Sequence, residues 1–141
     1  MPGPDFLDTD ILVCAYDRSD PEKRQIAQGL VRRAVTRSGE TVISPQVLGE
    51  FASTLLHKVS PAVRPARLLA VLDALSPIKL VDVNADTVRR AVEASAAYGI
   101  HFYDGMIVAA AERAGCARIW SEDLNAGQKY FGISVENPFR P

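Results

Sequence analysis

The 141-residue sequence is poor in the residues that build zinc sites and disulfide frameworks, with only two cysteines and two histidines. Cys14 and Cys116 lie in apolar segments, and neither has a second cysteine or a histidine at the short spacing typical of zinc ligands. We therefore expect both thiols to be free, small hydrophobic side chains in a reducing cytoplasm.

Net charge and long hydrophobic runs are also nearly absent. The 16 basic and 17 acidic residues leave a formal charge of -1, so any contact with nucleic acid must come from a local basic patch. No apolar run approaches the ~20 residues needed to cross a bilayer, and Met1–Asp5 lacks the basic start of a signal peptide. We expect a soluble, cytoplasmic protein with no membrane contact.

Hydrophobic residues make up 48% of the chain, enough for the core of one domain, which we place at residues 1–141. Short β-forming segments are predicted at residues 5–8, 41–44, 78–83, 118–121 and 133–135. The predicted helices run from Pro21 to Ser38-Gly39, from Ser44-Pro45 through Leu56, from Pro61 or Pro65 to about Ser76, from Asn84 through Ser95, and from Tyr103 to Ala114. This alternation predicts an α/β fold with a central, mostly parallel sheet of four to five strands flanked by helices.

Four acidic residues stand at the ends of these elements or on a helix beside them: Asp8, Glu50, Asp104 and Asp123. Asp8 ends the first strand and Asp123 follows the fourth, and ligands of parallel sheets gather beyond the carboxyl ends of the strands. Clustered carboxylates repel one another unless a divalent cation neutralises them, and oxygen ligands suit Mg²⁺ or Mn²⁺. The spacing predicts Asp8 as a ligand and Asp10 as a supporting residue that turns back to bind backbone amides.

Each of these acids also has a purely structural interpretation. Aspartate commonly caps helices, which would account for Asp8, and the helix dipole favours Asp104 in a first turn. Glu50 fits the polar face of its helix as well as it fits a cavity. Glu122 competes with Asp123 for the inward position, because a slip of one residue reverses the direction of a side chain.

These motifs, taken in order, resemble the PIN-domain ribonucleases, and in particular the VapC-type toxins of bacterial toxin–antitoxin pairs. The matching segments are Phe6-Leu-Asp8-Thr-Asp10-Ile-Leu, Ser44-Pro-Gln-Val-Leu-Gly-Glu50-Phe, Tyr103-Asp104-Gly-Met-Ile-Val-Ala-Ala-Ala111 and Trp120-Ser121-Glu-Asp123-Leu-Asn. The similarity extends from residue 6 to about residue 135, in the order and spacing of the family.

The resemblance implies a parallel α/β sheet with its acids in one pocket, Mg²⁺ or Mn²⁺ as the cofactor, and single-stranded or looped RNA as the substrate. It also implies a homodimer that a cognate antitoxin protein neutralises. The residues that match the catalytic and metal-ligating acidic quartet are Asp8, Glu50, Asp104 and Asp123. Ser121 matches the hydroxyl position that helps arrange the quartet, and Asp10 agrees with a position where the family has asparagine or aspartate. Asn125 stands where some members have a further aspartate.

Three alternatives share some of these features. A haloacid-dehalogenase-like phosphatase also begins with aspartates and uses Mg²⁺, but Asp8-Thr-Asp10-Ile-Leu lacks the threonine expected two places after the second aspartate. A phospho-acceptor signalling module needs a lysine at the end of its fifth strand, whereas Ile133-Ser-Val135 leads only to Glu136. The third alternative is a PIN fold that binds RNA without cutting it.

Overall fold

The computed structural model describes residues 3–140, so Met1, Pro2 and Pro141 of the predicted 1–141 domain lie outside the described residues. Across this range the chain forms six strands and six helices. The strands are β1 (Asp5–Leu7), β2 (Thr41–Ile43), β3 (Lys79–Leu80), β4 (Arg118–Trp120), β5 (Lys129–Tyr130) and β6 (Ile133–Glu136). The helices are α1 (Thr9–Tyr16), α2 (Pro21–Thr36), α3 (Pro45–His57), α4 (Pro65–Leu75), α5 (Ala85–Tyr98) and α6 (Phe102–Arg113).

All strands join one sheet in the order β3-β2-β1-β4-β6-β5. Every neighbouring pair is parallel except β5 and β6, which are antiparallel. The predicted fold class is thus confirmed, with one strand more than the four to five expected. The extra strand is β5, whose two residues are too few to show the alternation from which a strand is predicted.

Helix α1 is the largest difference from the predicted elements, because the sequence indicates a helix after Asp8 only through the alternative role of that residue as a cap. The run Ile11-Leu-Val-Cys-Ala is apolar on consecutive positions, which hides helical periodicity over only eight residues. Strand β3 is also shorter than the predicted 78–83. Of the two predicted starts of the third helix, Pro61 and Pro65, the structure has Pro65, because a residue before proline, here Arg64, favours extended backbone.

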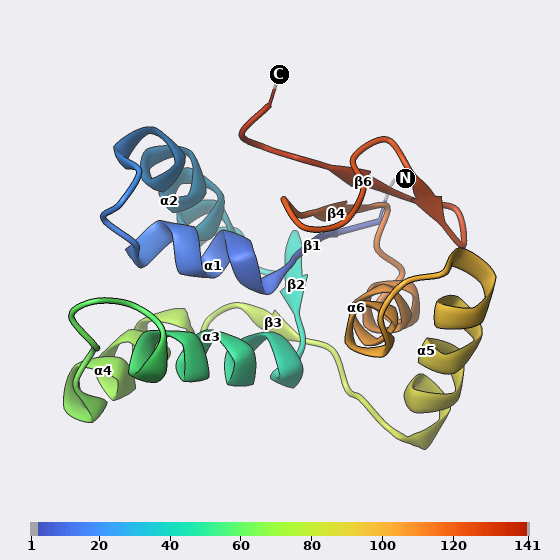
Figure 1. Cartoon of the computed structure of the whole chain (residues 1–141), viewed down its shortest axis with the longest axis horizontal. Coiled ribbons are helices and arrows are strands. Elements are labelled where there is room, and N and C mark those ends of the chain that lie inside the picture. Colours follow the sequence, from blue (N-terminus) through green and yellow to red (C-terminus); the bar gives the residue numbers. More distant parts are fainter. Residues whose placement is uncertain (1–2, 141) are drawn as a thin grey trace.

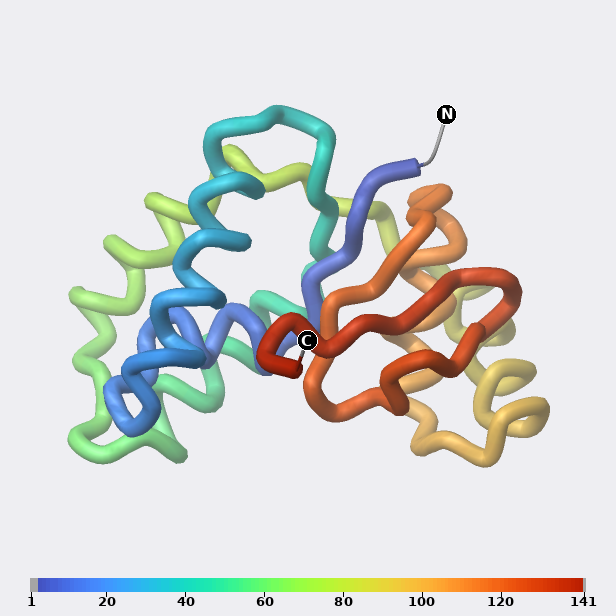
Figure 2. Tube along the Cα trace, turned by 90° about the horizontal axis from the view of Figure 1, so that it is seen from above, coloured from blue at the N-terminus to red at the C-terminus, as the bar shows by residue number. Residues whose placement is uncertain are grey.

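The helices form two groups around the sheet. Helices α1 to α4 gather on one side of the strands, and α5 packs with α6 on the other (Figure 1, Figure 2). Within residues 3–140, no helix combines the length and the apolar character needed to span a lipid bilayer.

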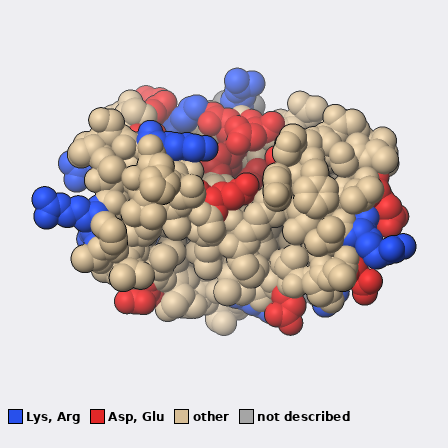
Figure 3. All heavy atoms as spheres, turned by 60° about the horizontal axis from the view of Figure 1, so that its bottom comes forward, with Lys and Arg blue, Asp and Glu red and all other residues tan. Residues whose placement is uncertain are grey.

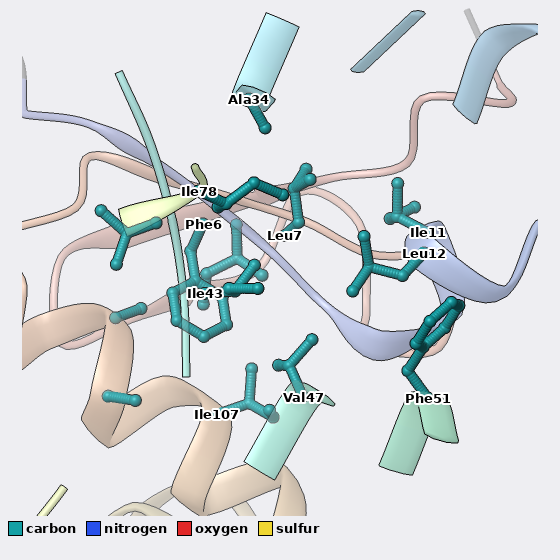
Figure 4. Close-up of a cluster of buried hydrophobic side chains, with 14 of the residues drawn as sticks. Phe6, Leu7, Ile11, Leu12, Ala34, Ile43, Val47, Phe51, Ile78 and Ile107 are labelled. Carbon is teal, nitrogen blue, oxygen red and sulfur yellow. The ribbon is translucent and has the colours of Figure 1, made fainter. Parts of the chain in front are cut away.

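The hydrophobic core follows from the alternation of side chains along β1. Phe6 lies on the side of Ile107 in α6, whereas Leu7 points to the other face, toward Ala34 in α2 (Figure 4). Both side chains are fully buried, at 0% and 1% exposure. Strand β1 therefore lies at the centre of the core as well as near the centre of the sheet.

The topology changes direction next to β1. The chain passes from β1 to β2 and β3 on one side, and then returns to place β4 and β6 on the other side. In parallel sheets, the crevice at such a switch point, beyond the carboxyl ends of the strands, is where ligands bind. Here that crevice lies beyond Leu7 of β1 and Trp120 of β4.

Candidate metal centre

Asp8 lies at the switch point, at the end of β1. Its backbone N–H donates to the Trp120 carbonyl at 3.0 Å, which extends the β1–β4 pairing by one step. One carboxylate oxygen accepts from the Thr9 N–H at 2.7 Å, and the other accepts from the Ser121 hydroxyl at 2.8 Å. Asp8 is therefore both the N-cap of α1 and a side chain held across the crevice, so its two interpretations are compatible.

Asp10 stabilises the turn that follows β4 by hydrogen bonds to its backbone. Its Oδ2 accepts from the backbone N–H groups of Glu122 and Asp123, at 2.8 and 2.9 Å. Ser121 also stabilises this turn, since its hydroxyl oxygen accepts from the Leu124 N–H at 3.1 Å. The two segments that follow β1 and β4 are thus tied together by side chains on both sides.

Two helices bring the remaining acids. Glu50 lies in the middle of α3, is exposed, and accepts a hydrogen bond from the Thr9 hydroxyl at 2.8 Å. Asp104 lies in the first turn of α6 and is half-buried. Helix α6 comes close to α5 at the adjacent Gly105, where a Cβ would lie 2.6 Å from the Ala91 carbonyl oxygen.

The predicted quartet lines a single cavity of about 530 Å³. Asp8, Glu50, Asp104 and Asp123 all face it, together with Asp10. Figure 3 shows acidic side chains gathered in a hollow between two bulkier parts of the surface. Ser121 does not line the cavity and is fully buried behind Asp8.

The electrostatics of this cavity are those of an uncompensated acidic cluster. Burial raises the pKa of the Asp8 carboxyl to about 6, and the charge of Asp123 adds to the shift. Burial also raises the pKa of Asp10 to about 8, with Asp8 as the next cause. The pKa of Asp104 is raised as well, first by burial and then by Asp123. Each of these carboxylates is harder to ionise than it would be in water.

The donor set fits a hard divalent cation. All the acids supply oxygen, which Mg²⁺ and Mn²⁺ prefer, and the buried Oδ1 of Asp10 has no hydrogen-bond partner among the described residues. Over residues 3–140, no three His, Cys, Asp or Glu side chains lie close enough to hold one ion as they stand. The residues therefore fit such an ion by chemistry and charge, and side-chain rotation must complete the set.

The profile of the PIN domain matches residues 6–131 of this chain. The chain belongs to the PIN-domain family. Comparison with curated proteins gives no match. The resemblance that the acidic motifs suggested is confirmed.

Solved structures of VapC toxins and their complexes share this PIN fold. VapC20 of Mycobacterium tuberculosis, described as a sarcin–ricin loop cleaving toxin, is 20% identical with a TM-score of 0.64, over 84% of this chain and 91% of that one. A toxin–antitoxin complex from Klebsiella pneumoniae is 17% identical with a TM-score of 0.69, over 94% and 96%. DNA-bound VapBC from Salmonella typhimurium is 19% identical with a TM-score of 0.67, over 96% and 98%.

The sequence did not single out some polar residues of the PIN-domain cavity. Thr9 lines the cavity, and its hydroxyl donates a hydrogen bond to Glu50. Ser53 and Thr54 also line it. The signal for these two was available, because positions three and four residues beyond Glu50 share its helix face.

Proposed function

We propose that this protein is a metal-dependent endoribonuclease that hydrolyses RNA phosphodiester bonds with Mg²⁺ or Mn²⁺, and that it is the toxin of a type II toxin–antitoxin pair. The observation that carries the proposal is the convergence of Asp8, Glu50, Asp104 and Asp123 on one cavity at the switch point of the sheet. Membership of the PIN-domain family supports the same chemistry.

The acids of the cavity would have different roles in this reaction. Asp8, Asp104 and Asp123 are the acids that would hold the ion, with Asp8 fixed by the Ser121 hydroxyl. When bound, a divalent cation supplies positive charge for the transition state of phosphodiester hydrolysis and makes water more acidic. Glu50 uses Oε1 to accept from Thr9, which leaves its Oε2 for a water molecule or the ion.

The proposed partners are an RNA substrate, a cognate antitoxin protein and a second copy of the chain. Support for the first two comes from the neighbouring structures, one described as a sarcin–ricin loop cleaving toxin and another as a toxin–antitoxin complex, whereas the second copy rests on the family resemblance alone. At 20% identity or less, these structures share the fold with this protein, so each partner needs its own test.

The direct test is cleavage of a sarcin–ricin stem-loop and of total ribosomal and transfer RNA by the purified protein. We expect cleavage with Mn²⁺ or Mg²⁺, its loss in EDTA, and its loss in the Asp8→Asn variant. Gel electrophoresis of end-labelled RNA reports both the rate and the position of the cut.

Other outcomes would replace the proposal. Intact RNA with turnover of p-nitrophenyl phosphate would indicate a phosphatase, and labelling of an aspartate by acetyl phosphate would indicate a signalling module. RNA that is bound but never cut, with every metal tried, would indicate a non-catalytic RNA-binding protein.

A further inference from the structure

A second cavity of about 360 Å³ lies beside the first, and Cys14 lines both. Glu122 lines the second cavity, whereas Asp123 lines the first. Two adjacent acids of one turn therefore point into different cavities. This arrangement decides which of them can serve the metal centre.

The backbone contacts of the turn do not make that choice. Asp10 binds the N–H groups of Glu122 and Asp123 alike, so it fixes the backbone without selecting a side chain. The selective contact is an ion pair between the Lys23 ammonium of α2 and the Glu122 carboxylate. Lys23 is itself held from another side, 5.4 Å from the centre of the Phe139 ring.

The charges of the second cavity show why Lys23 is needed. Asp17, Asp20 and Glu122 line it, and among the described residues Lys23 is the one cation that does so. Without Lys23, three carboxylates would share a small polar cavity with no compensating charge. Their repulsion would drive Glu122, the acid carried by a turn, out of this cavity and disturb Asp123 beside it.

We propose that Lys23 is a positioning residue for the metal centre, because its ion pair with Glu122 keeps that carboxylate in the second cavity and leaves Asp123 to face the first. This inference rests on the proposed function only in assuming that the first cavity binds a divalent cation. It concerns the geometry of the acids and is independent of which RNA is cut.

The sign of the effect separates positioning from simple electrostatics. Lys23 is a positive charge near a cation site, so by Coulomb's law alone its removal would tighten Mn²⁺ binding. A positioning role predicts the opposite, because a displaced Asp123 is lost as a ligand. The Lys23→Met variant therefore distinguishes the two by direction.

The measurement is the Mn²⁺ dissociation constant of the full chain at pH 7.5, from the electron paramagnetic resonance signal of free Mn²⁺. We expect Lys23→Met to weaken binding about tenfold, the lower end of what loss of an outer-shell partner costs a metal site. We expect Lys23→Arg to retain binding, and the exchanged pair Lys23→Glu with Glu122→Lys to restore most of it.

Arg33→Met is the matched control. It removes the same charge from the same helix, where Arg33 pairs at 3.0 Å with Glu40, just before β2 and away from the carboxyl ends of the strands. We expect its Mn²⁺ dissociation constant to stay within about twofold of the wild type, because salt screens the interaction between an exposed charge and a distant cation.

Unchanged or tighter Mn²⁺ binding in Lys23→Met would overturn the positioning role. If that variant fails to unfold cooperatively on heating, weakened binding in a folded exchanged pair would overturn the role instead. A wild-type chain that binds no Mn²⁺ would overturn the metal centre itself, whereas Mn²⁺ binding without RNA cleavage would overturn only the proposed nuclease.

Discussion

Strand β1 has an aspartate at each end, and the two have opposite surroundings. Asp5 begins the strand and accepts from the Arg118 guanidinium at 2.9 and 3.2 Å and from the Trp120 indole N–H at 3.1 Å. Asp8 directly follows the other end of the strand and accepts from the Ser121 hydroxyl across the crevice. Among the described residues, no cation contacts it. Both pairings join residues 113 positions apart, so one parallel register produces both.

The comparison shows that compensation, rather than acidity, distinguishes a structural carboxylate from a candidate functional one. Arg118 reaches Asp5 and Glu136 together and lies 4.1 Å from the Trp120 ring centre, so that end of the sheet carries its own counter-charge. At the other end, Lys58 lines the acidic cavity but pairs with none of its carboxylates within residues 3–140. The proposed divalent cation would supply the missing counter-charge.

The largest expected effect is on RNA cleavage by the matched variants Asp8→Asn and Asp5→Asn. Loss of Asp8 should lower the cleavage rate at least about a thousandfold, since metal-ion catalysis supplies several kcal/mol. Asp5→Asn should retain most of the activity, because that carboxylate lies at the other end of the strand. Single-turnover cleavage with saturating Mn²⁺ measures both rates.

The same pair of variants should shift stability in opposite directions in EDTA at pH 8. Asp8→Asn removes a buried charge and should raise the free energy of unfolding by about 1–3 kcal/mol. Asp5→Asn removes one partner of a half-buried ion pair and should lower it by about 1 kcal/mol. Urea denaturation gives both values, and equal signs would contradict the contrast between the two ends.

The stability of the folded chain should also depend on pH. The folded pKa values of Asp8, about 6, and Asp10, about 8, exceed the ordinary value of 3.8, so the folded chain keeps protons that the unfolded chain releases. Their contribution to stability is therefore fully present below about pH 4, falls as the pH rises, and levels off above about pH 8. For Asp8 alone the loss is on the order of 3 kcal/mol.

The difference in the free energy of unfolding between the wild type and Asp8→Asn reports the contribution of Asp8 together with the part of the Asp10 pKa shift that the Asp8 charge causes. In EDTA, the free energy of unfolding of the variant should rise relative to that of the wild type between pH 4 and pH 7, as measured by urea denaturation at each pH. Saturating Mn²⁺ should reverse the trend, because it binds the ionised carboxylates. A difference that stays constant over this range would refute the uncompensated burial of Asp8.

A further prediction tests whether the acidic end depends on the close approach of α6 to α5. An alanine at position 105 would bring its Cβ to 2.6 Å from the Ala91 carbonyl oxygen, a backbone atom that cannot easily move. We expect Gly105→Ala to destabilise the fold by about 2 kcal/mol through overpacking. Thermal unfolding measures the change.

Gly29 offers a matched control within α2. A Cβ there would meet nothing within 4 Å, so Gly29→Ala should stabilise the fold by up to about 1 kcal/mol through helix propensity. The same substitution thus has opposite signs at the two positions. Equal effects at both would remove the argument for close helix packing beside Asp104.

The smallest expected effect is at Thr9. Thr9→Val removes the 2.8 Å hydrogen bond that holds Glu50 and should lower the cleavage rate about threefold, since such an exposed bond contributes about 0.5–1 kcal/mol. Thr9→Ser keeps the hydroxyl and should behave as the wild type. A Thr9→Val rate equal to that of Thr9→Ser would indicate that Glu50 needs no support.

Much of the fold was predictable from local patterns. Strands bounded by turn residues and helices with clear caps are encoded within short windows, and proline at the first helical position marked the start of α2 and α3. Helix α1 and strand β5 could not be predicted in this way, because eight and two residues carry too little periodicity. Their formation depends on packing against distant parts of the chain.

Residue types within short windows were enough to predict the α/β class and to place the acids at strand ends or on helices. Which acids are compensated, and which way each side chain points, depends on contacts that form in the folded chain. Asp5 and Asp8 differ through partners 113 positions away, and Glu122 is separated from Asp123 by a lysine in α2. Charge compensation is a property of contacts between distant segments, and no local pattern encodes them.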